Sequence, residues 1–174
     1  MRQELKRKLA RVKLFLCDVD GVLTDGTVLM GNGVESKRFN ILDGLGLRLL
    51  QRAGVEVGWV SRRPSSATTM RANDLKIDYL LQIDGSKVQA VEALLERAGR
   101  VWGEGCYVGD DIVDLGVLRK AGVSVGVANA IEEVKAAADY VTRRQGGQGA
   151  VREVVDLILK AQRRWTAVIR EYSQ

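Results

Sequence analysis

The sequence predicts an α/β protein in which a parallel β-sheet lies between two layers of helices. Short runs rich in β-forming residues alternate along the chain with segments of helical periodicity. Strands that alternate with helices of this length build parallel sheets covered on both faces. The 174 residues, 46% of them hydrophobic, are enough for one substantial core. We therefore expect a single domain over residues 1–174, of the three-layer α/β/α class.

The strands and helices are predicted in chain order from these runs and periods. The strands are expected at residues 12–17, 55–60, 77–81, 105–108 and 123–127, with a short sixth run at 140–141. The helices between them are expected at residues 45–53, 65–73, 87–98, 112–121 and 131–137. Gly54, Gly99 and Gly122 follow three of these helices, where glycine accepts the left-handed backbone that ends a helix.

Two segments depart from this alternation. Residues 27–40 (TVLMGNGVESKRFN) follow the first strand and predict an inserted β-hairpin that turns at residues 31–33. Residues 150–172 predict one long helix, because apolar side chains recur there at three- and four-residue spacing. We expect the first half of that helix to pack in the core. The part beyond Arg164 is a candidate contact with a partner subunit.

The composition excludes several kinds of chemistry and of location. The chain has no histidine, which removes Ser-His-Asp and Cys-His catalysis and histidine-ligated metals. Its two cysteines, Cys17 and Cys106, form no CxxC pair, so neither a four-cysteine zinc site nor a disulfide framework is expected. No apolar run is long enough to span a membrane, and the charged first residues do not resemble a secretory signal. We expect a cytoplasmic protein with no membrane partner.

The formal net charge of +5 comes largely from residues 2–13 and 143–170. Such an excess could attract nucleic acid or a phosphorylated ligand. Solvated helix faces explain it more simply, and the sequence shows no alternation of basic and aromatic residues for base stacking. We expect no nucleic-acid partner. DNA binding through the two ends stays an alternative, and it would depend steeply on salt.

Polar side chains follow four of the predicted strands at the point where each strand ends. They are Asp18 and Asp20 after the first, Ser61, Arg62 and Arg63 after the second, Lys87 after the third, and Asp110, Asp111 and Asp114 after the fourth. Because ligands of an open α/β sheet bind beyond the carboxyl ends of its strands, we expect these side chains on one rim. So many carboxylates repel one another unless a cation lies among them, and hard oxygen ligands select magnesium.

The spacing of Asp18 and Asp20 indicates phosphoryl transfer. Residues two apart in an extended chain point to the same side, so both carboxylates can face one reacting group. Asp18 would attack phosphorus and form an aspartyl phosphate, while Asp20 would act as general acid and then as general base. Lys87 and the Ser61 hydroxyl would hold the phosphoryl oxygens. Each residue alone is common by chance, and the hypothesis depends on all four pieces in this order.

These residues resemble the four motifs of the haloacid dehalogenase superfamily of phosphatases. The motifs are DVDGVLTDG at residues 18–26, the hydroxyl of Ser61, Lys87, and GDDIVD at residues 109–114. The hairpin, FNILDGLG at residues 39–46, and the stretches at 138–142 and 146–153 are similar to one branch, the 3-deoxy-D-manno-octulosonate 8-phosphate phosphatases. The resemblance covers residues 12–160.

The resemblance implies a Rossmann-like fold without a cap domain and a set of residue roles. Asp18, the main-chain carbonyl of Asp20 and Asp110 would bind Mg²⁺, with Asp111 and Asp114 in support. Ser61, Arg63, Lys87, Thr24 and Gly44 would contact the phosphate or the rest of the substrate. The reaction implied is hydrolysis of this sugar phosphate, which releases phosphate and the free eight-carbon acid sugar used in lipopolysaccharide synthesis. The hairpins of such proteins pack together in a homotetramer, in which a neighbouring subunit helps to close each active site.

The chain departs from the pattern of this branch at three places. The usual Thr-Gly-Arg after the second strand is Ser61-Arg62-Arg63, which keeps the hydroxyl and the arginine but loses the glycine. Arg63 favours the eight-carbon substrate, because relatives that act on nine-carbon acid sugars often have glutamate there. Leu42 replaces an arginine that could contact the sugar carboxylate. The tail, residues 163–174, lacks the usual glycine-rich character.

Two alternatives to this function stay open at the level of the sequence. Leu42 and Arg62 leave room for a nine-carbon acid-sugar 9-phosphate or a broader set of phosphomonoesters as the substrate. A non-catalytic homologue, like the module attached to some sugar-activating cytidylyltransferases, is the other. The intact Asp18, Asp20 and Lys87 argue against it.

Overall fold

The computed structural model describes residues 3–31 and 33–173, and it confirms the predicted α/β class. Six parallel strands form the central sheet in the order β5-β4-β1-β6-β7-β8. They are β1 (Leu14–Cys17), β4 (Glu56–Ser61), β5 (Tyr79–Gln82), β6 (Gly105–Gly109), β7 (Val123–Gly126) and β8 (Tyr140–Val141). All six lie at or within two residues of their predicted ranges, because each is a compact β-rich run bounded by turn residues.

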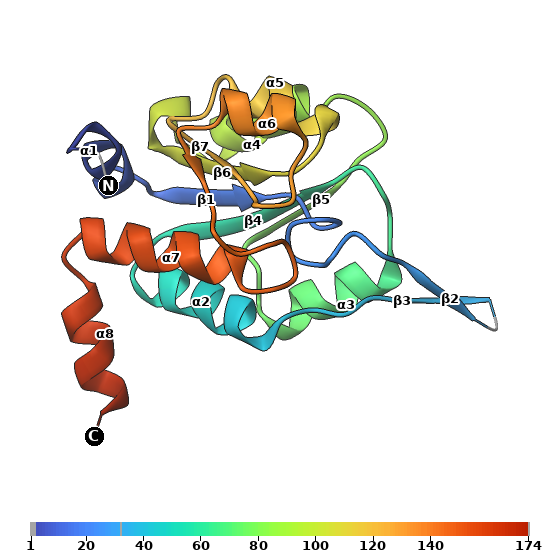
Figure 1. Ribbon diagram of the computed structural model, residues 1–174, viewed down its shortest axis with the longest axis horizontal. Helices are drawn as coiled ribbons and strands as arrows, with labels where there is room; N and C mark the ends of the chain where they lie inside the picture. The colour runs from blue at the N-terminus through green and yellow to red at the C-terminus, as the bar shows by residue number, and fades with distance from the viewer. Residues whose placement is uncertain (1–2, 32, 174) are drawn as a thin grey trace.

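Helices cover both faces of the sheet, as Figure 1 shows. One face carries α2 (Ile41–Arg52), α3 (Ser66–Asp74) and α7 (Ala150–Ala161), and the other carries α4 (Lys87–Ala98), α5 (Leu115–Leu118) and α6 (Glu132–Ala137). The remaining helices are α1 (Gln3–Ala10), α8 (Trp165–Tyr172) and the 3₁₀ turns η1 (Trp102–Glu104) and η2 (Ile112–Asp114). None of the helices in the described ranges is long and apolar enough to cross a membrane.

The core lies on both sides of β1, the strand that carries the first acidic motif. All four residues of β1 are buried, as expected for a central parallel strand with helices on both faces. Helix α7 packs on one side of the sheet through a stripe of fully buried residues that includes Val151, Val154, Val155 and Ile158. Because β1 is held between β4 and β6, the residues that follow it begin from a fixed position.

The predicted helix over residues 150–172 is wrong, since the chain forms two helices there. Helix α7 ends at Ala161, and Arg163 takes a left-handed backbone with φ of 60°. The N–H of Arg164 donates to the carbonyl of Leu159 at 2.8 Å, which closes the end of α7. Helix α8 then runs away from the sheet (Figure 1). Helical spacing on both sides of the break concealed it, because the break depends on one backbone angle.

Two other expectations about helices need correction. The helix predicted over residues 112–121 divides into η2 and a short α5 that ends at Leu118. Gly54 and Gly99 have the expected positive φ of 74° and 62°. Gly122 does not, and it is needed for close packing, since a Cβ there would lie 2.6 Å from the carbonyl oxygen of Gly103.

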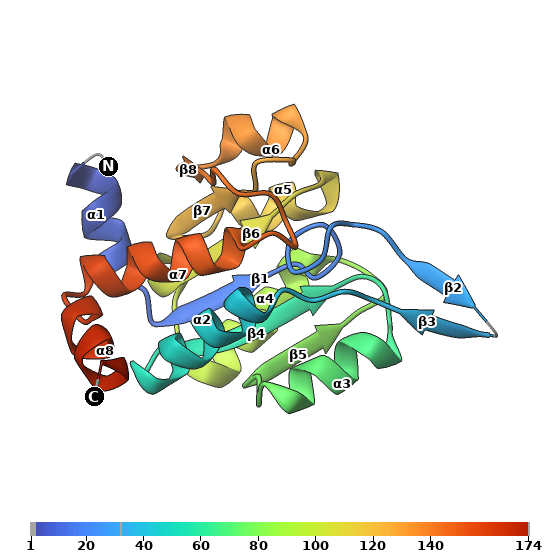
Figure 2. The same cartoon turned by 60° about the horizontal axis from the view of Figure 1, so that its bottom comes forward.

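The predicted hairpin is confirmed as the antiparallel pair β2 (Leu29–Gly31) and β3 (Val34–Ser36). It projects from the end of the molecule at which the strands of the sheet point (Figure 2). Leu29, Met30 and Val34 are all more than half exposed on it. Asn32, in the predicted turn, lies outside the described residues.

Candidate functional site

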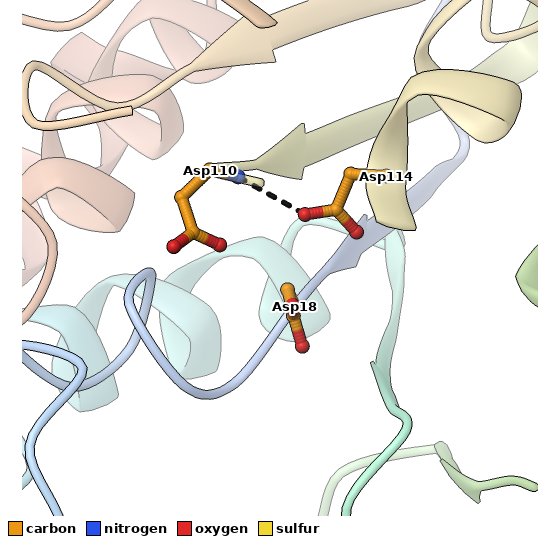
Figure 3. A group of neighbouring side chains, drawn as sticks. All are labelled: Asp18, Asp110 and Asp114. Atoms are coloured by element: carbon orange, nitrogen blue, oxygen red, sulfur yellow. Dashed lines mark hydrogen bonds between the residues drawn. The ribbon is translucent and has the colours of Figure 1, made fainter. Parts of the chain in front are cut away.

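An acidic cluster lies at the carboxyl end of the two central strands. Asp18 directly follows β1, Asp110 directly follows β6, and Asp114 ends the η2 turn beyond it (Figure 3). One carboxylate oxygen of each lies within 4.8 Å of the others. The hydrogen bond between β1 and β6 at this edge, from the N–H of Asp18 to the carbonyl of Val108 at 3.0 Å, sets the two motifs side by side. The two strands therefore bring Asp18 close to Asp114, which lies 96 positions later in the sequence.

Lys87 lies inside this cluster and is almost fully buried, with 3% of its surface exposed. Its Nζ is 2.8 Å from Oδ2 of Asp18 and 2.8 Å from Oδ1 of Asp114. Lys87 is the first residue of α4, and the side chain of Ser86 caps that helix. Burial alone would lower the pKa of Lys87, but the Asp18 and Asp114 carboxylates raise it above its ordinary value. The side chain is therefore held as a cation between two carboxylates.

The carboxylate of Asp114 is saturated by donors from the chain itself. Its Oδ1 accepts from the hydroxyl of Tyr107 at 2.6 Å as well as from Lys87. Its Oδ2 accepts from the N–H of Asp110 at 3.0 Å, the bond drawn in Figure 3. Asp111 is exposed and caps η2 by accepting from the N–H of Ile112 at 2.7 Å. Asp114 thus orders the Asp110 loop and the lysine, and Asp111 orders the η2 turn.

The negative charges of Asp18 and Asp110 are offset by fewer hydrogen-bond donors than the charge of Asp114. Burial, followed by the charge of Asp114, raises the pKa of Asp18 to about 6 against the lowering effect of Lys87. Burial, followed by the charges of Asp18 and Asp114, raises the pKa of Asp110 to about 7. Oδ1 of Asp110 is buried and has no hydrogen-bond partner among the described residues. One lysine cannot offset this much negative charge, so the cluster is suited to a cation.

The residues present fit a magnesium ion. The available ligands are carboxylate and carbonyl oxygens, which hard divalent cations prefer. Gly21 lies against the carboxylate of Asp110, and a Cβ at that position would collide with it. The lack of a side chain at Gly21, which has φ of 91°, thus keeps the loop after β1 close to Asp110. Asp18 and Asp110 remain the carboxylates with coordination capacity, because each oxygen of Asp114 accepts from two donors, each oxygen of Asp18 meets only one, and Oδ1 of Asp110 has none among the described residues.

Asp20 faces a different partner, a lysine of the hairpin. Nζ of Lys37 lies 2.7 Å from Oδ1 and 2.9 Å from Oδ2 of Asp20. The same Nζ donates to Oγ1 of Thr68 on α3 at 3.1 Å. Lys37 follows β3 directly, and its side chain is fully buried. Asp18 and Asp20 therefore lie in one loop but are paired with different lysines.

The Ser61-Arg62-Arg63 segment closes on itself at the end of β4. The Ser61 hydroxyl is buried and accepts from the N–H of Arg63 at 3.0 Å. Arg62 is exposed and is absent from the described non-glycine residues of positive φ, so the loop has no need of glycine there. The guanidinium of Arg63 lies 2.6 Å from Glu35 of β3. Glu35 also accepts from the hydroxyl of Ser65, the N-cap of α3, at 2.7 Å.

Two predicted substrate contacts, Thr24 and Gly44, have packing roles in this structure. Thr24 is fully buried, and its Oγ1 accepts from the N–H groups of Gly21 and Gly26 at 3.3 and 3.2 Å. It holds the tight loop after β1 together. Gly44 lies in α2, where a Cβ would lie 2.5 Å from a guanidinium nitrogen of Arg71. Neither residue has a described contact with Asp18, Lys87 or Asp110.

Sequence reasoning missed Lys37, Glu35 and Tyr107. Tyr107 lies in a run that reads as a buried strand, and its hydroxyl becomes relevant only beside Asp114. Glu35 and Lys37 are two apart in the predicted hairpin, and in an extended strand this spacing places two side chains on one face. That alternation was the available signal, but it does not show which residues the face meets.

The comparisons with known proteins agree on one family. A family model described as haloacid dehalogenase-like hydrolase matches residues 61–154. The 3-deoxy-D-manno-octulosonate 8-phosphate phosphatase KdsC of Yersinia pestis is 43% identical over 157 residues, which are 90% of this chain and 84% of that protein. The protein of the same name from Escherichia coli (strain K12) is 44% identical over 156 residues, 89% of this chain and 83% of that protein.

Solved structures show the same likeness over the whole fold. The 3-deoxy-D-manno-octulosonate 8-phosphate phosphatase of Moraxella catarrhalis, crystallised with magnesium ion, phosphate ion and KDO, has a TM-score of 0.96 to this chain. It is 38% identical in sequence, and the match covers 99% of each chain. The Yersinia pestis enzyme has a TM-score of 0.93 at 40% identity, covering 95% of this chain and 90% of that one.

Proposed function

The chain belongs to the haloacid dehalogenase-like hydrolases, and from that premise we propose that it is the magnesium-dependent phosphatase of 3-deoxy-D-manno-octulosonate 8-phosphate. The products are phosphate and the free acid sugar, a lipopolysaccharide precursor. The observation that carries this proposal is the placement of Asp18, Lys87 and Asp110 within one oxygen-rich cluster. Relatives with the same named activity match about nine-tenths of the chain.

Asp18 is the nucleophile in this proposal. Its Oδ1 accepts from the N–H of Val19 at 2.6 Å and its Oδ2 contacts Lys87, so the carboxylate has one orientation. Attack of a carboxylate oxygen on phosphorus forms the aspartyl phosphate as the bond from phosphorus to the sugar oxygen breaks. Asp18, Asp110 and the main-chain carbonyl of Asp20 would hold Mg²⁺. The ion, when bound, offsets the repulsion between the Asp18 carboxylate and the phosphoryl oxygens.

Asp20 handles the protons of both steps. It donates a proton to the sugar oxygen as that oxygen leaves phosphorus, which avoids release of a free alkoxide. The resulting carboxylate then accepts a proton from the water that attacks the aspartyl phosphate. This second step returns Asp18 as a free carboxylate and Asp20 in its protonated form. Lys87 and the Ser61 hydroxyl would bind phosphoryl oxygens as their charge redistributes.

The rest of the substrate is contacted at the edge of the site. Arg63 would contact the acid sugar. Its guanidinium pairs with Glu35 in this structure, so it would have to bind both groups or leave Glu35. Thr24 and Gly44 stay proposed substrate contacts, although Thr24 also holds the loop after β1 together and Gly44 packs against Arg71. Relative kcat/KM values for eight- and nine-carbon acid-sugar phosphates would show whether Leu42 and Arg62 broaden the specificity.

We further propose that the chain works as a homotetramer in the cytoplasm, with each active site closed by a neighbouring subunit. Leu29, Met30 and Val34 expose 60%, 69% and 59% of their surfaces on a hairpin that projects from the sheet. Two strands alone are barely stable in water, and exposed apolar surface of this kind marks a protein contact. Light scattering on the purified protein would give the mass of four chains. A monomeric mass in active enzyme would contradict the tetramer, and cell fractionation tests the location.

The decisive experiment measures phosphate release from 3-deoxy-D-manno-octulosonate 8-phosphate with magnesium. We expect Asp18→Asn to lower kcat by ~10⁴-fold or more, since losses of this size follow removal of a nucleophile. Chelation of magnesium should abolish release by the wild type. The matched control is Asp84→Asn, an exposed carboxylate after β5 on the same side of the sheet, which should keep wild-type activity. A silent wild type, or an active Asp18→Asn variant, would contradict the proposed function.

A further inference from the structure

The ammonium of Lys37 is held in one place by three elements of the fold. It meets both carboxylate oxygens of Asp20 in the loop after β1, at 2.7 and 2.9 Å. It donates to the buried hydroxyl of Thr68 on α3 at 3.1 Å. Glu35, two residues earlier on the hairpin, lies 3.5 Å away. A lysine with this set of partners has little freedom to move.

The burial of Lys37 indicates that this contact is built for a purpose. None of its side chain is exposed, whereas 24% of the Asp20 side chain is. A buried ammonium costs stability unless it is paired and hydrogen-bonded, and here each requirement is met by a different segment. By contrast, the side chain of Lys120, which pairs with Glu92 on the surface, is 48% exposed. Lys37 therefore restrains Asp20 from the protein side, while part of the Asp20 side chain stays exposed.

We propose that Lys37 is a positioning residue, which fixes the carboxyl group of Asp20 in line with the oxygen that leaves phosphorus. This inference rests on the proposed function of the site. Lys37 transfers no proton in it and does not touch the substrate. Its effect is on direction, because Oδ2 of Asp20 accepts from the Lys37 ammonium and Oδ1 lies 2.7 Å from the same nitrogen, which restrains rotation of the carboxyl group. The position of the hairpin, through Lys37, thereby sets the geometry of proton transfer.

Substitution of Lys37 should affect substrates differently according to their leaving groups. A sugar alkoxide needs the proton of Asp20 as it leaves, whereas p-nitrophenolate is stable enough to leave without one. The value of kcat/KM reports the steps up to formation of the aspartyl phosphate and so excludes the later hydrolysis. A residue that positions the acid affects kcat/KM for the sugar phosphate alone. A residue that only supports the fold affects both substrates equally.

The test compares Lys37→Met, Lys37→Arg and the control Lys120→Met on 3-deoxy-D-manno-octulosonate 8-phosphate and on p-nitrophenyl phosphate. We expect Lys37→Met to lower kcat/KM about 10²-fold for the sugar phosphate, a loss in the range that general acids contribute. For the aryl phosphate the loss should be less than about fivefold. Lys37→Arg keeps the charge but changes its reach. It should lower the ratio of kcat/KM for the sugar phosphate to kcat/KM for the aryl phosphate to an intermediate degree. Lys120→Met should change neither value. Equal losses on both substrates, or no loss, would overturn the proposal.

Two further measurements keep the outcome clear. In an Asp20→Asn background, Lys37→Met should have no additional effect on the ratio, because the group that it positions is gone. If Lys37→Met does not fold, the ratio for Lys37→Arg decides. If the wild type hydrolyses neither substrate, the proposed function fails, and a crystal structure of Lys37→Met decides the positioning role separately. A displaced Asp20 carboxylate would support that role, and an unmoved one would refute it.

Discussion

The candidate site consists of two parts that are supported in different ways. The sheet-held part, Asp18, Lys87, Asp110 and Asp114, stands on the ends of β1, β6 and α4 and is mostly buried. The hairpin-held part, Glu35, Lys37 and Arg63, joins a projecting two-stranded hairpin to the loops after β1 and β4. Both parts contain a lysine between carboxylates. They differ in what fixes them, since the core of the protein fixes the first and the placement of the hairpin fixes the second.

The carboxyl groups of the two parts have pKa values shifted in opposite directions. Burial and crowding raise the pKa values of Asp18 and Asp110, so their charged forms are disfavoured by folding. A hydrogen bond from Ser65, with the charges of Lys37 and Arg63, lowers the pKa of Glu35, so its charged form is favoured. The sheet-held part therefore stores repulsion that a cation relieves, whereas the hairpin-held part is already neutralised. The comparison predicts distinct responses to substitution.

The largest effect is expected for Lys87→Met. Loss of this ammonium leaves Asp18 and Asp114 buried without a counter-charge, which should cost about 3–5 kcal/mol of the free energy of unfolding. Phosphate release should be lost as well. Denaturant unfolding, with Lys120→Met as the control, measures the stability. Lys37→Met should cost clearly less stability, because the side chains of its partners Asp20 and Glu35 are 24% and 14% exposed and can be solvated by water. Equal losses would contradict the distinction between the two parts.

A smaller effect of the opposite sign is expected for Asp110→Asn in protein freed of magnesium. The folded-state pKa of Asp110, about 7, is above its ordinary value of 3.8, so the folded state binds the proton more tightly than the unfolded state does. Its charge therefore becomes destabilising as the pH rises from about 4 through 7. After allowance for solvent screening, the variant should be about 1–2 kcal/mol more stable at pH 8, a rise in Tm of a few degrees.

The same experiment has two internal checks. The gain in Tm of Asp110→Asn over the wild type should shrink as the pH falls to 5, because the wild-type carboxyl group is then protonated. Addition of magnesium should raise the Tm of the wild type more than that of the variant, because the ion binds the folded wild-type cluster. A variant that is less stable than the metal-free wild type at pH 8 would show that repulsion does not dominate the cluster.

The smallest effect is expected for Glu35→Gln in the hairpin-held part. The lowered pKa means that Glu35 stabilises the fold above its unfolded pKa, and that this contribution is lost as the pH falls through the lower folded value. Because Arg63 is 44% exposed, the loss at neutral pH should be below about 1 kcal/mol. Thermal unfolding at pH 7 checks this. A loss as large as that of Lys87→Met would mean that the hairpin is as integral to the fold as the sheet.

Much of the sheet-held part could be predicted from the sequence, and the hairpin-held part could not. Asp18, Lys87 and Asp110 follow recognisable strands, and parallel strands place their carboxyl ends on one edge whatever the details of packing. The partner of Lys37 depends on the angle at which the hairpin leaves the sheet. No rule of spacing gives that angle, so a lysine in a polar strand reads as a solvated side chain.

The sequence by itself therefore determined the fold class, the order of the acidic and basic motifs that follow the strands, and the convergence of these motifs at one rim of the sheet. These depend on the periodicity of apolar residues and on the direction of parallel strands, which are local properties. Only the tertiary structure decided the break at Arg163, the saturation of Asp114 by Tyr107, and the pairing of Asp20 with Lys37. Each of these depends on one backbone angle or on one contact between segments that are distant or differently oriented, and such contacts form only when the whole chain is packed.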